Sequence, residues 1–154
     1  MRTILIISLT LALTGCGRNA ANQPLDESTS DRHLDEDSFD AAALAIVQRH
    51  TGIQLPDGSR GLKMFYQGST LNPAFVAKIQ IPVASGDELA GRLEKIQSQN
   101  ATVSGALTSK VTWWNPSSGV MRVQRQFTPG GDHVLAILIQ EKDRLVLYLE
   151  WMSI

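Results

Sequence analysis

The chain has 154 residues, one cysteine, three histidines and a formal net charge of −1 at pH 7. A near-neutral chain without a basic stripe is a poor match to a nucleic-acid-binding protein, and a single cysteine excludes an internal disulfide. Once a leader segment is set aside, the length allows one domain with a substantial core.

The chain begins with the pattern of a secretory signal. Arg2 supplies a positive charge, and residues 4–13 form an apolar run without charge. As a helix this run would span about 15 Å, roughly half of the hydrocarbon thickness that a transmembrane helix must cross. The segment is therefore too short for a permanent span, and it has the length and flanking charge of a secretory signal.

The apolar run ends in Leu13-Thr14-Gly15-Cys16. This segment resembles the lipobox of bacterial lipoproteins, in which a leucine and two small residues precede an invariant cysteine. The resemblance implies a signal peptide over residues 1–15, diacylglycerol on the Cys16 sulfur and a second acylation at the new amino terminus. It also implies the periplasmic face of the outer membrane, because Gly17 is not the aspartate that favours inner-membrane retention. The alternative is an ordinary cleavage site beside a chance cysteine.

Residues 16–37 are expected to be the lipidated cysteine followed by a disordered acidic tether. The stretch is polar, and its only large apolar side chains are Leu25 and Leu34. Such a composition cannot bury enough apolar area to offset the entropy of ordering it. A docking motif for a partner is the alternative. A single α+β periplasmic domain is then expected over residues 38–154.

Two amphipathic helices are predicted in this domain. The first covers residues 38–50, with Asp37 or Ser38 as its cap, and Gly52 is placed to adopt a left-handed conformation after its last turn. The second begins at a capping box, Ser85 to Glu88, and continues to about Ser98. Each has one apolar side, so both are expected to pack on the same face of a sheet.

Five segments have the alternating or continuous apolar pattern of strands: residues 62–67, 74–81, 120–127, 134–139 and 145–151. In residues 120–127, Met121, Val123 and Phe127 are expected on one face. Residues 111–119 are interpreted as a short strand or strand end that leads into a turn. Short connections favour antiparallel pairing. The prediction is a two-layer α+β domain, in the order αββαβββ, with about five antiparallel strands.

Catalytic and metal-binding patterns are not found in the sequence. The histidines His33, His50 and His133 do not form a pair at zinc-ligand spacing, so neither a metal nor a cofactor is expected. Asp132 and His133 suggest a catalytic dyad, but neighbouring residues of a strand point to opposite faces, and a hairpin turn is the better interpretation. We therefore expect a non-catalytic domain.

The clearest candidate for a binding surface is Trp113-Trp114-Asn115, with Lys110 and Arg122 as polar neighbours. In an extended segment one indole would face the core and the other would face out. An exposed tryptophan beside a polar turn can stack on a sugar or peptide, or anchor a protein interface. The alternative is that both indoles pack against the helix layer or the sheet edge.

Together these features predict a lipid-anchored periplasmic lipoprotein with a non-catalytic binding or accessory domain. Its expected partners are the membrane, through the lipid on Cys16, and a protein of the envelope. The alternative function is an inhibitor or immunity protein that neutralises an envelope-targeted toxin or hydrolase. Size, anchorage and compartment are the only support for that alternative.

Overall fold

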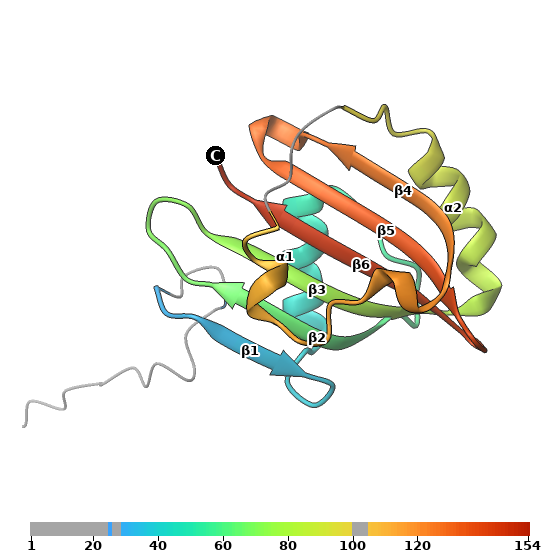
Figure 1. Ribbon diagram of the computed structural model, residues 1–154, viewed down its shortest axis with the longest axis horizontal. Helices are drawn as coiled ribbons and strands as arrows, with labels where there is room; N and C mark the ends of the chain where they lie inside the picture. Colours follow the sequence, from blue (N-terminus) through green and yellow to red (C-terminus); the bar gives the residue numbers. More distant parts are fainter. Residues whose placement is uncertain (1–24, 26–28, 100–104) are drawn as a thin grey trace, which may run out of the picture.

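The computed structural model describes residue 25 and residues 29–99 and 105–154. Within this part of the chain, one antiparallel sheet has the strand order β1-β2-β3-β6-β5-β4, with two α-helices beside it (Figure 1). The strands are β1 (Arg32–Asp35), β2 (Arg60–Gln67), β3 (Ala74–Ile81), β4 (Val120–Phe127), β5 (His133–Glu141) and β6 (Arg144–Met152), and the helices are α1 (Ala41–Thr51) and α2 (Gly86–Glu94). The α+β class is confirmed, with six strands in place of the expected five. Cys16 and the signal segment lie outside the described residues.

The additional strand, β1, comes from the segment that was expected to be a tether. It pairs antiparallel with residues 63–66 of β2, and Leu34 is buried in the main core. Leu25 is buried in the same core, and the His33 ring lies on the Phe65 ring with 4.7 Å between centroids. The prediction of disorder is therefore wrong for residues 32–35. The edge of β2 supplies the hydrogen-bond partners and the buried position that composition alone does not reveal.

The first helix begins later than the sequence suggested. Asp40 is its N-cap, and its carboxylate accepts a hydrogen bond from the Ala43 amide at 3.0 Å. Ser38 instead closes the preceding turn, where its hydroxyl donates to the Asp35 carboxylate at 2.9 Å. Gly52 has a φ of 68°, so the predicted left-handed helix end is confirmed.

The second helix is shorter than predicted and begins differently. A short 3-10 turn, Val83–Ser85, leads into α2, and the Ser85 side chain makes no capping hydrogen bond. The predicted capping box is therefore wrong. The helix ends at Glu94, before the expected Ser98.

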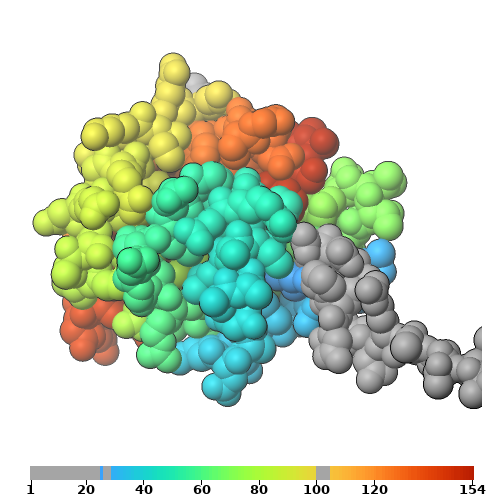
Figure 2. Space-filling view, turned by 180° about the vertical axis from the view of Figure 1, so that it is seen from behind, coloured from blue at the N-terminus to red at the C-terminus, as the bar shows by residue number. Residues whose placement is uncertain are grey.

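Both helices cover one face of the sheet, as predicted. Figure 2 views the molecule from this side, with α1 in cyan and α2 in yellow-green. Val47 of α1 and Leu89 of α2 join one buried cluster with the inward side chains of the central strands, including Ile79, Leu147 and Trp151. At the β2 end, Phe39 packs directly over Gly61, where any side chain would collide with its ring.

The opposite face of the sheet is covered by residues 105–119, of which residues 111–119 are predicted as a short strand or strand end. They form two short 3-10 turns, Thr108–Lys110 and Pro116–Ser118, and do not pair with the sheet. Leu107 is buried against Phe65 and Val76, while Trp114 packs on Tyr148. The near-continuous apolar runs of β5 and β6 require cover on both faces, and this segment supplies it.

Strand β4 has an irregularity that changes one predicted face. Its register with β5 shifts between Met121 and Val123. Val123 and Phe127 are buried on the helix side, whereas Met121 remains 56% exposed. The expected face is therefore wrong for Met121, because a bulge adds a residue that the simple alternation does not include.

Candidate functional site

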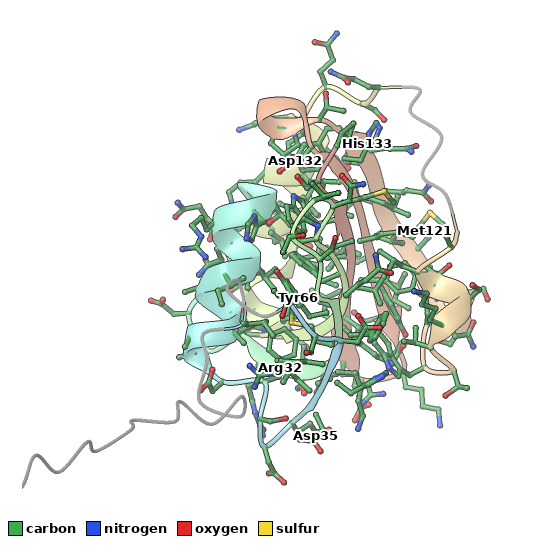
Figure 3. All side chains as sticks on the ribbon, turned by 90° about the vertical axis from the view of Figure 1, so that its left-hand side faces the viewer. Arg32, Asp35, Tyr66, Met121, Asp132 and His133 are labelled. Carbon is green, nitrogen blue, oxygen red and sulfur yellow. The ribbon has the colours of Figure 1, made fainter. Side chains whose placement is uncertain are left out.

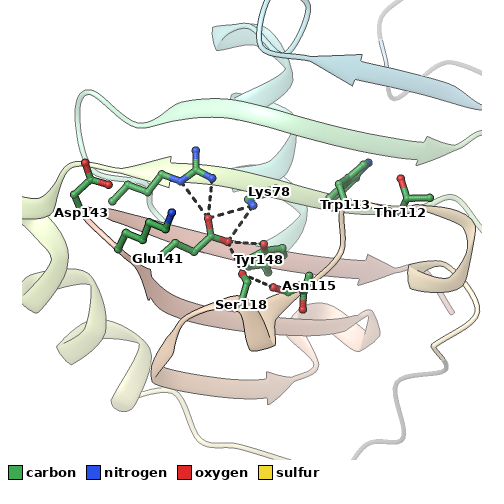
Figure 4. A pocket seen from close by; sticks show the side chains of 10 residues that line it. Lys78, Thr112, Trp113, Asn115, Ser118, Glu141, Asp143 and Tyr148 are labelled. Carbon is green, nitrogen blue, oxygen red and sulfur yellow. Dashed lines mark hydrogen bonds and ion pairs between the residues drawn. The ribbon is translucent and has the colours of Figure 1, made fainter.

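The main cavity lies on the face opposite the helices. Its volume is about 580 Å³, and residues 112–118 form one side of it while the β5–β6 turn forms the other. Figure 4 shows Trp113 on one wall, with Glu141 and Lys78 between it and the turn. The cavity is therefore assembled from strand ends and from the segment that covers this face.

Glu141 is the centre of this site and is only 8% exposed. Its Oε1 atom accepts hydrogen bonds from the Tyr148 hydroxyl at 2.8 Å and the Ser118 hydroxyl at 2.9 Å. Lys78 Nζ lies 3.0 Å from Oε1 and 3.3 Å from Oε2. Arg144 donates to Oε2 from Nε at 3.1 Å and from Nη2 at 2.9 Å. This cluster, which we call the Glu141 cluster, joins four parts of the chain.

The strand register explains why these groups meet. Glu141 ends β5 and Arg144 begins β6, and the two residues pair across the turn. Lys78 on β3 is the register partner of Tyr148 on β6, so both side chains lie on the same face as Glu141. Lys142 has a φ of 50°, which lets the chain reverse within the two residues between the strands. Ser118 reaches the carboxylate from the covering segment.

The cluster holds Glu141 in its ionised form. Burial by itself would raise the pKa of Glu141, but the hydrogen bonds from Tyr148, Lys78, Ser118 and Arg144 together lower it to about 2. Burial is also the main reason that the pKa of Tyr148 is raised. A general acid or base works best with a pKa near the operating pH and with access to substrate. The pKa of Glu141 is far from neutral pH and its oxygens are already bonded, so the geometry fits a carboxylate that fixes the side chains around it.

The structure brings together only part of the predicted binding surface. Trp113 and Asn115 line the cavity, and Trp113 is half-buried. Trp114 is also half-buried and packs edge-on against the Tyr148 ring, with 5.3 Å between the ring centroids. It therefore contacts a residue that lines the cavity and does not line the cavity itself. Both indoles pack partly on the sheet face, so the alternative in which both are packed is the nearer one, with the sheet face in place of the helix layer or the sheet edge.

Two predicted polar neighbours lie apart from the cavity. Lys110 donates to the Gln67 side chain at 2.7 Å and lies over the Phe65 ring at 5.8 Å. Arg122 forms an ion pair with Asp87 of α2, on the helix side of the sheet. The bulge in β4 accounts for the direction of Arg122, and the prediction that it neighbours the tryptophans is wrong.

Sequence reasoning missed the Glu141 cluster. Residues 141–144 have the composition of a charged hairpin tip, which gives no sign of a buried carboxylate. The one available signal was Lys78 itself, a lone charge in an otherwise apolar strand that pairs with the Tyr148 strand. Its partner Glu141 is 63 residues away in sequence, and only the sheet order brings the two together.

A second cavity, of about 380 Å³, lies on the other side of Trp113. Its lining includes His33 and Asp35 of β1 and Lys63 of β2, and it shares Thr112 and Trp113 with the main cavity. Hydrogen bonds from the Ser38 hydroxyl and amide are the main causes that lower the pKa of Asp35. The two cavities therefore meet at the half-buried Trp113 side chain.

Asp132 and His133 lie at the other end of β5 from Glu141. Figure 3 shows them on one side of the sheet, far from Arg32 and Asp35 of β1, which is the strand at the opposite edge. Asp132 accepts a hydrogen bond from the Trp151 indole at 3.0 Å, which assigns its carboxylate a structural partner. Within the described part of the chain, His133 Nδ1 is buried without a hydrogen-bond partner.

Another carboxylate, Glu150, lies in the middle of the covered face. It is 2% exposed, its register partners are Val76 and Leu135, and its Oε1 atom has no hydrogen-bond partner among the described residues. Burial raises the pKa of Glu150 to about 7. Glu150 thus shares a sheet face with Glu141, but its pKa is raised by burial whereas the pKa of Glu141 is lowered by hydrogen-bond donors.

Among the residues that the structure describes, no group of three or more histidine, cysteine, aspartate and glutamate side chains is arranged to hold a metal ion. Neither helix in the described ranges has the length and apolar character needed to cross a bilayer. Comparison with protein-family models, with curated proteins and with solved structures gives no match.

Proposed function

We propose that this protein is a lipid-anchored lipoprotein of the bacterial envelope whose domain binds a ligand, without catalysis, in the cavity beside Trp113. The Leu13–Cys16 segment supports the anchor, and Gly17 favours the periplasmic face of the outer membrane. Two or more acyl chains hold a protein firmly on a membrane, so no spanning helix is needed.

The observation that carries the binding role is the Glu141 cluster beside an accessible indole. The carboxylate is ionised and surrounded by donors, and it therefore fixes Arg144, Lys78 and Ser118 at one side of the cavity. Preorganised side chains lose little conformational freedom when a ligand binds, which favours affinity. The opposite wall, Trp113, offers a flat apolar surface of the kind that dominates binding energies.

The same observation argues against proton-transfer chemistry in this cavity. The only deeply buried carboxylate there has a pKa of about 2 and is already bonded to four side chains. A ligand in this cavity would meet an ionised carboxylate whose charge is balanced by Lys78 and Arg144, and side chains that these bonds already hold in place. This supports a binding or accessory module.

The anchor is tested by metabolic labelling with palmitate and by membrane fractionation. The wild-type chain should incorporate the label and sediment with membranes, and the Cys16→Ser variant should lose both properties. An unlabelled wild-type protein, or a Cys16→Ser variant that stays equally membrane-bound, would contradict the anchor.

The binding role is tested by placing a photo-crosslinking amino acid at Thr112, which is exposed and lines the cavity. Irradiated cells should give an adduct with envelope material at this position, and Trp113→Ala should remove it. The same amino acid at Asp57, an exposed turn residue outside this cavity, is the matched control. Equal adducts at both positions would contradict a binding site at Trp113.

A further inference from the structure

We infer that the two cavities on either side of Trp113 form one groove and that this groove binds an oligosaccharide chain. The inference rests on the proposed binding role of the cavity and names the class of its ligand. Thr112 and Trp113 belong to the lining of both cavities, so a ligand that lies on the indole extends into each of them. The ligand is therefore longer than one ring.

The polar groups that remain available are of mixed character. The hydrogen bonds of Lys78 and Arg144 go to Glu141, and that carboxylate is saturated. In the described structure, hydrogen-bonding partners are lacking for the Asn115 amide nitrogen, the Asp143 carboxylate and the Thr112 hydroxyl. These groups are a donor, an acceptor and a group that is both. A polyhydroxyl ligand suits such a mixture. A polyanion would need a larger excess of cations than the two linings offer, which is four lysine and arginine side chains against three carboxylates.

The apolar part of the site centres on the flat Trp113 ring, with Tyr148 beside it in the main cavity and Leu34 and Met64 in the second. A pyranose presents its C–H groups on one face and its hydroxyls around the rim. An indole bordered by hydroxyl, amide and carboxylate side chains is complementary to both features at once.

The position of the groove disfavours a peptide bound by strand addition. Lys78 and Tyr148 lie on β3 and β6, the two central strands, whose backbone groups are already paired on both sides. Strand addition requires a free sheet edge. The groove lies on the face of the sheet, so only side chains are offered to the ligand.

At the end of the groove formed by the second cavity, His33 offers a contact that only a long ligand would make. His33 is exposed and lies on the Phe65 ring, and it lines the second cavity with Lys63. His33 lines only the second cavity, so a short chain held in the main cavity would not contact it, whereas a longer chain that fills both cavities would. Removal of the His33 side chain should therefore weaken long ligands and leave short ones unaffected.

The experiment is calorimetric titration of the full-length protein in detergent with β-1,4-linked N-acetylglucosamine oligomers of two, four and six units. Affinity should rise with chain length. Trp113→Ala should weaken the hexamer by roughly tenfold or more, and Trp113→Phe should restore part of the affinity. Asn115→Ala and Asp143→Asn change exposed side chains and test the site without disturbing packing; each should weaken binding about threefold to tenfold.

His33→Ala should weaken the hexamer and not the dimer, and Leu71→Ala, at an 83% exposed position, should change nothing. Absence of binding at any length, or binding unaffected by both Trp113→Ala and Asp143→Asn, would overturn the inference. A peptide that binds in a Trp113-dependent manner where the sugars do not would overturn the saccharide class and leave the proposed binding role intact. Retained sugar binding without a Thr112 crosslink in cells would support the inference and contradict only the expected adduct with envelope material.

Discussion

Glu141 and Glu150 are two buried carboxylates on the same face of one sheet, and they differ in almost every physical respect. Glu141 lies at the strand end, where Lys78, Arg144, Ser118 and Tyr148 satisfy both of its oxygens. Glu150 lies between Val76 and Leu135, and one of its oxygens has no partner in the described structure.

The difference shows what burial does to a carboxylate with and without donors. Donors lower the pKa of Glu141 to about 2 although burial opposes them, whereas burial alone raises the pKa of Glu150 to about 7. The first group stays charged and organises a cavity wall. The second becomes neutral below about pH 7 and is a source of pH sensitivity in the fold.

The largest expected effect is the loss of the Glu141 side chain. Glu141→Ala leaves Lys78 and Tyr148 without their partner in a largely buried place, so the free energy of unfolding should fall by about 3 to 5 kcal/mol. Urea denaturation measures this. The control is Glu88→Ala, which removes an exposed pair with Arg92 at 3.8 Å and should cost less than about 0.5 kcal/mol. Equal losses for the two variants would contradict the structural role of the cluster.

The second prediction concerns Glu150 and the pH range from about 4.5 to 7. Its folded-state pKa of about 7 lies above the value of 4.5 expected in the unfolded chain, so the folded state binds more protons between these values. Stability should therefore be complete below about pH 4.5 and fall by about 3 kcal/mol as the pH rises through 7. Unfolding measured from pH 5 to 9 gives this slope.

Glu150→Gln provides the matched comparison for that slope. The amide keeps the shape of the side chain and cannot ionise, so the loss of stability between pH 5 and 8 should disappear. A wild-type protein whose stability is flat over this range would show that the Glu150 carboxylate is solvated or paired in solution.

The third prediction concerns the loss of stability at acid pH, which Glu141 should cause. Its folded-state pKa lies below the unfolded value of 4.5, so its contribution is present above pH 4.5 and is lost as the pH falls towards 2. Because the Arg144 side chain is 46% exposed, we expect solvent to reduce this contribution to about 2 kcal/mol. Glu141→Gln should remove this loss of stability at acid pH and leave the loss that Glu150 causes up to about pH 7 unchanged. Unfolding of Glu141→Gln and Glu150→Gln, measured as a function of pH, would establish this.

The smallest expected effect belongs to Arg122, which was predicted as a neighbour of the tryptophans. Arg122→Ala breaks only the pair with Asp87, whose side chain is 91% exposed, so stability should change by about 0.5 kcal/mol or less. Sugar binding should be unaffected. A large loss of binding in this variant, measured by the same titration, would place Arg122 in the site after all.

Much of the sheet could be predicted because its signals are local. The bounds of β3 agree with the alternating pattern of residues 74–81, and Gly52 ends α1 in the predicted left-handed conformation. Strand β1 could not be predicted, because Leu34 stands alone in an acidic segment and is ordered by the edge of β2.

The site was only partly predictable for a related reason. Trp113 and Asn115 stand out as residue types, so they could be selected from the sequence. The Glu141 cluster depends on the registers of β3 with β6 and of β5 with β6, which no local pattern encodes. Residues 105–119 have no periodicity, and their conformation follows from how Leu107 and Trp114 pack on the sheet.

Amide hydrogen exchange of the full-length protein, with and without the N-acetylglucosamine hexamer, tests the central claim most directly. The account predicts added protection in residues 112–118 and 141–144, on the two sides of the Trp113 groove, and none in α1 or α2. Protection confined to the helix side, or unchanged exchange in both groove segments at saturating hexamer, would contradict it.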